Sequence, residues 1–215
     1  MPIAKHVVFD LDGVMVDSEP VQERATAEYL ASLGAAGQAD AELLDDMMGR
    51  RVRDLTDALA ERLGLPPDQV FEDREAVFWR LLDQGIEAMP GLHAAVDRLA
   101  AAGLWLAVAS SGTRAYVDHV LDRLQVRAAF AAVVSGEDVH RGKPDPEIYL
   151  LAAERLQADP GDCVAIEDTT HGIAAARAAG MRAVAVTHPM NVALDLSAAD
   201  AVVPDLAAAA DWILV

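Results

Sequence analysis

The sequence has little of several features that mark particular classes of protein. Only one of its 215 residues is a cysteine, Cys163, so no disulfide can form within the chain. Cys163 begins the apolar run 163–166, which is typical of a buried structural thiol rather than a nucleophile. A chain without internal disulfides fits a reducing compartment, and we expect a cytoplasmic location.

Basic residues are also scarce. Lys and Arg number 17 against 35 Asp and Glu, which gives a net charge of −18. Such a chain repels nucleic acid and anionic membrane surfaces, so we expect neither as a partner. No apolar run approaches the length of a membrane span, and the N-terminus lacks the pattern of a secretory signal. We expect a soluble protein, and a monomer.

What the sequence does contain is an alternation of short apolar runs and helical patterns. Hydrophobic residues make up 53% of the chain, enough for one core or for a core domain with a small insert. The β-branched apolar runs predict strands at residues 6–10, 104–110, 131–135, 163–167, 183–187 and 201–203. Helical patterns separate most of them, which predicts an α/β fold with a mainly parallel sheet covered on both faces.

This alternation is interrupted between residues 19 and 85, where every pattern is helical. The expected helices span residues 21–33, 41–48, 52–63 and 67–82. An insertion directly after the first strand predicts a small α-helical cap domain at residues 18–87. The core domain would then consist of residues 1–17 and 88–215. Proline and glycine in the segments 17–20 and 88–91 suit the two hinges.

Polar residues follow several of the predicted strands, whose carboxyl ends meet at one edge of a parallel sheet. Adjacent carboxylates repel unless a cation or proton lies between them, and oxygen ligands without His or Cys suit Mg²⁺. A hydroxyl and free amides at a helix start, together with a lysine, suit a phosphate group. Each feature alone could be a helix cap or a solvated charge, but their joint placement predicts one site. The residues are Asp10, Asp12, Ser110, Lys143, Glu167 and Asp168.

The same motifs, in this order, resemble those of haloacid dehalogenase superfamily hydrolases. Asp10-Leu11-Asp12-Gly13 resembles the first motif, Ser110 the second, Lys143 in Gly-Lys-Pro-Asp-Pro the third, and Glu167-Asp168 the fourth. The resemblance covers essentially the whole chain, including a helical cap inserted after the first strand. It implies a Rossmann-like core and phosphoryl transfer, and it leaves the substrate open.

The resemblance also implies roles for the acids. Asp10 would be the nucleophile that forms an aspartyl phosphate, and Asp12 would be the general acid and base. Mg²⁺ would be held by Asp10, Asp168 and the backbone carbonyl of Asp12. Glu167 would be either a further metal ligand or a residue that orients one. Superfamily members that break carbon–halogen bonds lack an acid at the position of Asp12, so dehalogenation is disfavoured.

Substrate binding is assigned in the same way. Lys143 and Ser110 would hold the phosphoryl oxygens, with help from the amides of Ser111 and Gly112. In the expected cap, Arg50 and Arg51 begin the basic stretch Arg50-Arg51-Val52-Arg53, which is the best candidate for contact with an anionic substrate. The alternative is a solvated helix start whose arginines pair with Asp45, Asp46 and Asp54.

Two activities in the subfamily compete. A β-phosphoglucomutase would have a histidine where Gln22 stands and a cap lysine near Glu75, although Arg74 or Arg80 could substitute. We therefore expect a Mg²⁺-dependent phosphatase acting on a small phosphorylated metabolite such as a sugar phosphate. A phosphosugar mutase is the alternative. A non-catalytic binding module is disfavoured because Asp10 and its partner motifs are all present.

Overall fold

The computed structural model describes residues 4–38, 51–189 and 191–215 of the chain. Its centre is a six-stranded parallel sheet in the order β5-β4-β1-β6-β7-β8. The chain extends the sheet on one side of β1 and then returns to place β6 on the other side, so the order reverses at β1 and β6. The predicted α/β fold is confirmed, with strand ends within one residue of those expected. The strands are β1 (His6–Phe9), β4 (Trp105–Ala109), β5 (Phe130–Val134), β6 (Cys163–Glu167), β7 (Arg182–Val186) and β8 (Ala201–Val203).

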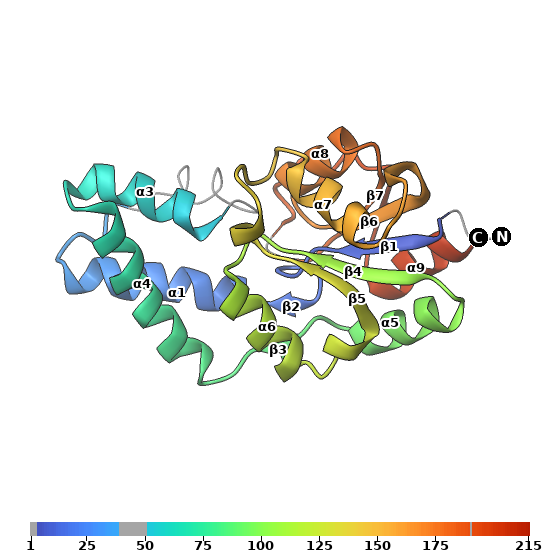
Figure 1. The fold of residues 1–215 in the computed structure, drawn as a ribbon. Coiled ribbons are helices and arrows are strands. Elements are labelled where there is room, and N and C mark those ends of the chain that lie inside the picture. The colour runs from blue at the N-terminus through green and yellow to red at the C-terminus, as the bar shows by residue number, and fades with distance from the viewer. Residues whose placement is uncertain (1–3, 39–50, 190) are drawn as a thin grey trace.

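Helices cover both faces of this sheet (Figure 1). One face packs against α7 (Glu147–Arg155) and α8 (Thr170–Ala178), and the other against α5 (Leu92–Ala101), α6 (Arg114–Arg123) and α9 (Leu206–Leu214). Val8 packs into the core on the side of α7 and α8, whereas Val7 and Phe9 pack into the core on the side of α5, α6 and α9. Successive strand side chains point to opposite faces, so a strand buried on both sides reads as a continuous apolar run.

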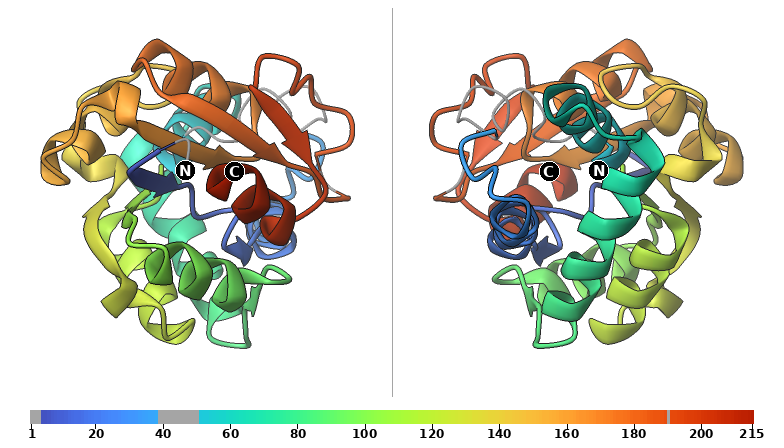
Figure 2. Two further views of the ribbon diagram at one scale, coloured as in Figure 1. Left: turned by 90° about the vertical axis from the view of Figure 1, so that its right-hand side faces the viewer. Right: turned by 90° about the vertical axis from the view of Figure 1, so that its left-hand side faces the viewer.

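Three further helices lie together at the end of the molecule opposite the termini, and we call them the helical lobe (Figures 1 and 2). They share a small core of Tyr29, Leu30, Leu59, Ala60 and Val70. The lobe consists of α1 (Glu19–Ser32), α3 (Val52–Leu63) and α4 (Pro67–Leu82). The bounds of α3 and α4 are those predicted; the helix expected at 41–48 lies outside the described residues.

The two connections between the sheet and the helical lobe pair with each other. Val16–Asp17 forms β2 and Glu87–Ala88 forms β3, and the two run antiparallel. The sequence analysis predicted hinge segments here but no strand pair, because two-residue strands carry no periodic pattern. This pairing brings the entry to the lobe and the exit from it side by side.

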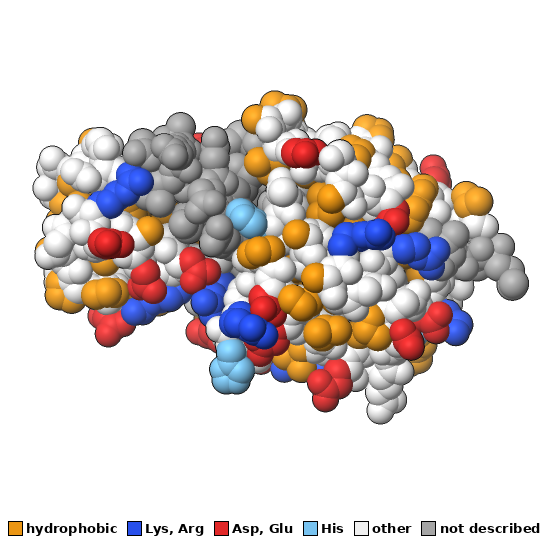
Figure 3. All heavy atoms as spheres, turned by 90° about the horizontal axis from the view of Figure 1, so that it is seen from above, with side chains coloured by type: hydrophobic (Ala, Val, Ile, Leu, Met, Phe, Trp, Pro, Cys, Tyr) orange, Lys and Arg blue, Asp and Glu red, His pale blue; other side chains and the backbone are white. Residues whose placement is uncertain are grey.

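Among the described residues, no helix has both the length and the apolar character of a membrane span. Cys163 is buried and forms no disulfide, so the predicted burial is confirmed, and burial raises the pKa of its thiol to about 11. Figure 3 shows acidic and basic side chains interspersed on the face seen there, with hydrophobic ones scattered among them.

Candidate active site

The residues that follow the central strands are held by continuations of the sheet. The amide of Asp10 donates to the carbonyl of Ile166 at 2.9 Å, one residue beyond β1. The amide of Ser110 donates to the carbonyl of Val134 at 3.0 Å, one residue beyond β4. Asp168 follows β6 directly. The strand ends therefore bring these three predicted site residues to one edge of the sheet, at the reversal of strand order.

Lys143 reaches this edge from the loop before α7. Its Nζ lies 2.7 Å from Oδ1 of Asp10 and 2.6 Å from Oε1 of Glu167, and all three side chains are buried. Burial alone would lower the pKa of Lys143, but the two carboxylates outweigh it and raise the pKa above its ordinary value. Burial raises the pKa of Asp10 to about 8, with Glu167 and Asp12 adding to the rise and Lys143 opposing it.

Glu167 has every acceptor position engaged. Its Oε1 accepts from Lys143 and, at 2.6 Å, from the hydroxyl of Tyr149. Its Oε2 accepts from the amides of Asp168 and Thr169 at 3.0 and 3.3 Å, and from the Thr169 hydroxyl at 3.2 Å. A carboxylate offers about four lone-pair positions, so these five donors leave none for another ligand. Burial opposes ionisation of Glu167, yet Lys143 and the hydrogen bonds lower its pKa.

Asp168 is held differently. Its Oδ2 lies 2.9 Å from Nε2 of His188, and its backbone carbonyl accepts from the Asn191 side chain at 2.9 Å. Its Oδ1 is buried and makes no hydrogen bond within the described part of the chain. Burial, reinforced by Glu167 and Asp10, raises the pKa of Asp168 well above its ordinary value. This oxygen is the one buried acceptor of the site that lacks a partner there.

These acids fit a small hard cation. Asp10, Glu167 and Asp168 each offer an oxygen, and the three oxygens lie within 4.8 Å of one another. Buried carboxylates with raised pKa values and an orphaned oxygen are stabilised by a divalent ion such as Mg²⁺. Because Glu167 has no lone pair to spare, Asp10 and Asp168 are the carboxylates that suit direct coordination.

Gly13 makes this packing possible. Its backbone has φ +74, and a Cβ there would lie 2.2 Å from Oδ2 of Asp168. A glycine therefore satisfies both the left-handed turn after β1 and the close approach of the β6 acid.

Asp12 belongs to a second group of contacts. Its Oδ1 accepts from the hydroxyls of Ser18 and Tyr116, and its Oδ2 accepts from Ser110 Oγ at 3.4 Å. Ser110 Oγ in turn accepts from the amide of Gly112 at 3.1 Å.

The structure thus brings the predicted residues Asp10, Asp12, Ser110, Lys143, Glu167 and Asp168 together. Ser111 lies half-buried in the turn between Ser110 and Gly112.

The arginines of the predicted cap stretch pair with nearby acids where the structure describes them. Arg50 lies outside the described residues. Arg51 pairs with Asp54 at 3.0 Å, as the alternative interpretation expected. It also donates to the carbonyl of His140 at 3.3 Å, and its side chain packs against Gly142 beside Lys143. Arg53 pairs with Asp57 at 3.0 Å and with Asp68 at 2.6 Å. Arg51 differs from Arg53 in that it also reaches the loop that carries Lys143.

Several contributing residues were missed from sequence. Tyr116, Tyr149 and His188 come from helix faces or a loop, and their spacing resembles ordinary core or surface positions. Thr169 could have been found from the sequence, because a threonine after an acid pair is typical of a helix N-cap. Its hydroxyl accepts from the Gly172 amide at 3.0 Å at the start of α8.

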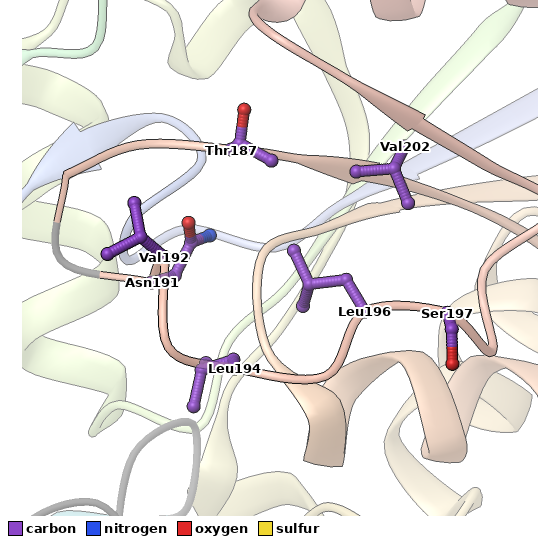
Figure 4. A pocket seen from close by; sticks show the side chains of 7 residues that line it. All are labelled: Thr187, Asn191, Val192, Leu194, Leu196, Ser197 and Val202. Carbon is purple, nitrogen blue, oxygen red and sulfur yellow. The ribbon is translucent and has the colours of Figure 1, made fainter.

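A separate hollow lies beside the loop that follows β7 (Figure 4). Its lining combines apolar side chains with two hydroxyls and the Asn191 amide, and it contains none of the predicted site residues. It is lined by Thr187, Asn191, Val192, Leu194, Leu196, Ser197 and Val202. Asn191 connects this hollow to the candidate site through its bond to the Asp168 carbonyl.

Comparisons with known proteins lead to the same group of enzymes. Residues 7–186 match the sequence model of the haloacid dehalogenase-like hydrolase family. Hexitol phosphatase B of Escherichia coli K12 is 34% identical over 185 residues, which is 85% of this chain and 83% of that protein. The structure of CbbY from Rhodobacter sphaeroides in complex with phosphate is similar, with a TM-score of 0.81, 26% identity and 95% of each chain covered. β-Phosphoglucomutase from Clostridium difficile shares the fold, with a TM-score of 0.83 at 23% identity over 94% and 92% of the two chains.

Proposed function

The chain belongs to the haloacid dehalogenase-like hydrolase family, and we propose that it is a magnesium-dependent phosphatase of small phosphorylated sugars or related metabolites. It is a phosphoric monoester hydrolase, as its phosphatase relatives are. The observation that carries the finer proposal is the arrangement of Asp10, Lys143 and Glu167 beside an orphaned oxygen of Asp168.

The chemistry assigned to the residues is an in-line substitution in two steps. A carboxylate oxygen of Asp10 attacks phosphorus and forms an aspartyl phosphate while the bond to the ester oxygen breaks. Asp12 gives a proton to the departing oxygen. Asp12 then takes a proton from the water that attacks the phosphorus, which releases phosphate and restores Asp10. Lys143 and Ser110 hold the phosphoryl oxygens in both steps.

The metal has a defined place in this proposal. Asp10, Asp168 and the backbone carbonyl of Asp12 would hold Mg²⁺, whose positive charge screens the repulsion between nucleophile and phosphate. Glu167 acts by fixing Lys143, because its oxygens are fully engaged by protein donors. Of the two roles that the sequence left open for Glu167, its contacts favour orientation over coordination.

The helical lobe favours hydrolysis over the mutase reaction. Arg74 is fully buried, and its guanidinium donates to the carbonyl and side chain of Gln22, to Thr26 and to Glu75. Arg80 is paired with Glu28 at 2.6 Å. Arg74 is therefore held by buried neighbours, and Arg80, the other arginine that could substitute for the mutase lysine, is paired at the surface. Water is the acceptor that this arrangement favours, and a monophosphate is the substrate class.

We assign residues 18–87 as the cap and residues 1–17 with 88–215 as the core. The contact of Arg51 with the loop at His140 and Gly142 supports this, since it joins the helical lobe to the neighbourhood of Lys143. The cap then covers the leaving-group side of the site, where it excludes bulk water. A cytoplasmic location and a monomeric state stay predictions.

One experiment separates the two activities. The protein is incubated with Mg²⁺, a trace of glucose 1,6-bisphosphate and either β-glucose 1-phosphate or a panel of sugar and hexitol monophosphates. Free phosphate and glucose 6-phosphate are measured, with EDTA as the control for metal dependence. We expect phosphate release that requires Mg²⁺. Formation of glucose 6-phosphate faster than phosphate would favour the mutase and contradict the proposal.

A further inference from the structure

We propose that Tyr116 positions Asp12 for proton transfer and thereby makes Oδ2 the oxygen that carries the proton to the leaving group. The inference rests on the proposed phosphatase function, in which Asp12 is the acid. It adds a residue that the motif pattern does not contain and assigns different tasks to the two oxygens of one carboxyl.

The contacts of Asp12 are unequal. Tyr116 is the third residue of α6, it is buried, and its hydroxyl donates to Oδ1 of Asp12. Ser18, which precedes α1, donates its hydroxyl to the same oxygen. Within the described part of the chain, Oδ2 receives one hydrogen bond, from Ser110 at the long distance of 3.4 Å. Oδ1 is thus fixed by two donors, and Oδ2 is the oxygen available to a substrate.

Tyr116 is a permanent donor under working conditions. The phenol of a tyrosine ordinarily has a pKa of about 10. The phenol therefore keeps its proton whenever the enzyme works near neutral pH. A fixed O–H donor on Oδ1 holds the plane of the carboxyl and stabilises the carboxylate that forms when Oδ2 loses its proton.

The ring of Tyr116 is itself held between the two parts of the molecule. Its centroid lies 5.4 Å from that of Phe78 in α4, with the rings at 66°. On the other side, a Cβ on Gly112 would lie 2.6 Å from the Tyr116 ring. The ring therefore fills the space between the turn after Ser110 and the helical lobe, so the orientation of Asp12 depends on both.

This placement predicts a defect that depends on the leaving group. A sugar alkoxide is a poor leaving group and needs a proton as the ester bond breaks, whereas p-nitrophenolate leaves without one. The ratio kcat/KM reports events up to formation of the aspartyl phosphate, before Asp12 acts as the base. A residue that positions the acid should therefore affect kcat/KM for sugar phosphates and spare p-nitrophenyl phosphate.

The test compares Tyr116→Phe with the wild type on p-nitrophenyl phosphate and on the sugar monophosphate that the wild type hydrolyses best. Loss of one hydrogen bond to a charged group predicts that kcat/KM falls about tenfold to a hundredfold for the sugar phosphate and less than about threefold for p-nitrophenyl phosphate. Tyr29→Phe is the matched control, since the Tyr29 hydroxyl is buried without a partner in the described part of the chain. We expect that control to leave kcat/KM unchanged for both substrates.

The outcomes separate this inference from the function on which it rests. If Tyr116→Phe lowers kcat/KM equally for both substrates, or for neither, then Tyr116 has only a packing role and the inference is wrong. Asp12→Asn should show the same selectivity for the leaving group, and its failure to do so would contradict the acid role of Asp12 itself. A wild type without phosphatase activity on any of these substrates would overturn the proposed function, and the inference with it.

Discussion

Nζ of Lys143 lies 2.7 Å from Oδ1 of Asp10, although 133 positions separate the two residues in the chain. The ion pair is almost fully buried, with side chains 1% and 7% exposed. Glu167 fixes the same ammonium group at 2.6 Å, so one positive charge joins the loop before α7 to the ends of β1 and β6. A phosphate entering the site would meet a lysine that is already ordered.

Removal of this lysine should cost stability as well as activity. Lys143→Met leaves the buried carboxylates of Asp10 and Glu167 without their cation, and such a change costs about 3–5 kcal/mol in the free energy of unfolding. Lys5→Met is the matched control, because its pair with Asp162 is exposed and contributes little to stability. Urea unfolding in EDTA measures both. Equal effects of the two substitutions would contradict the structural role of Lys143.

A methyl group at Gly172 should displace Glu167. A Cβ there would lie 1.8 Å from Oε1 and 2.1 Å from Oε2 of that carboxylate, which is already held by five donors. We expect Gly172→Ala to lower the free energy of unfolding by about 2–4 kcal/mol and to reduce kcat. Gly37→Ala is the control, since no atom of the described residues lies within 4 Å of its Cβ position. Thermal unfolding and phosphatase assays compare the two variants. If Gly172→Ala changed the free energy of unfolding and kcat as little as the control does, the close contact between Gly172 and Glu167 would be contradicted.

The two described arginines of the cap stretch should differ in their effect on substrate choice. Arg51 pairs with Asp54 and also contacts the loop beside Lys143, whereas the ion pairs of Arg53 are with Asp57 and Asp68. Arg51→Ala should lower kcat/KM for the best sugar phosphate about tenfold and alter the order of preferred substrates, since a charge-assisted contact is lost. Arg53→Ala should preserve that order. If both variants kept the wild-type order of preferred substrates, Arg51 would not be a determinant of specificity.

Glu19 should make stability depend on pH. Burial raises its pKa from the ordinary 4.5 to about 7, with Asp12 and other acids adding to the rise. Below pH 4.5 the group is protonated in both folded and unfolded chains, so it costs nothing. Between pH 4.5 and 7 the unfolded chain ionises first, so stability falls as pH rises, and the full cost is present above pH 7.

The variant Glu19→Gln removes this cost. Its gain in the free energy of unfolding should be larger at pH 8 than at pH 5, by on the order of 1–3 kcal/mol. Glu61→Gln, on the exposed face of α3, serves as the control. Urea titrations at the two pH values measure the difference. A gain that is the same at both values would show that Glu19 is not the titrating group.

Much of the sheet and of the candidate site could be predicted from sequence because both follow from strand periodicity. The apolar runs predict the strands, and parallel strands bring their carboxyl ends to one edge, so Asp10 and Asp168 had to meet. Lys143 alone could have been a solvated loop charge, and it was predicted because it stands in the sequence among the polar residues that follow the strands. The role of the arginines in substrate choice stays a prediction, and the sequence does not show which acids Arg51 and Arg53 pair with.

The residues that orient the site could not be predicted for a physical reason. Tyr116 and Tyr149 lie on helices whose buried faces read as ordinary core, and only the hydroxyl distinguishes them from packing residues. The β2–β3 pair is too short to leave a periodic signal. Arg74 could not be predicted for the opposite reason. A charged residue in a helix is usually solvated, but Arg74 is buried and its charge is neutralised by Glu75.

The central claim is that Asp10 carries the phosphoryl group during turnover. The most direct test is to quench the enzyme in acid during steady-state hydrolysis of its best sugar phosphate with Mg²⁺, and to locate any phosphoryl group by peptide mass spectrometry. The account predicts one added phosphoryl group on the peptide that contains Asp10, absent in EDTA and in Asp10→Asn, which should be folded but inactive. A phosphoryl group on another residue, or hydrolysis by Asp10→Asn at a rate near that of the wild type, would contradict it.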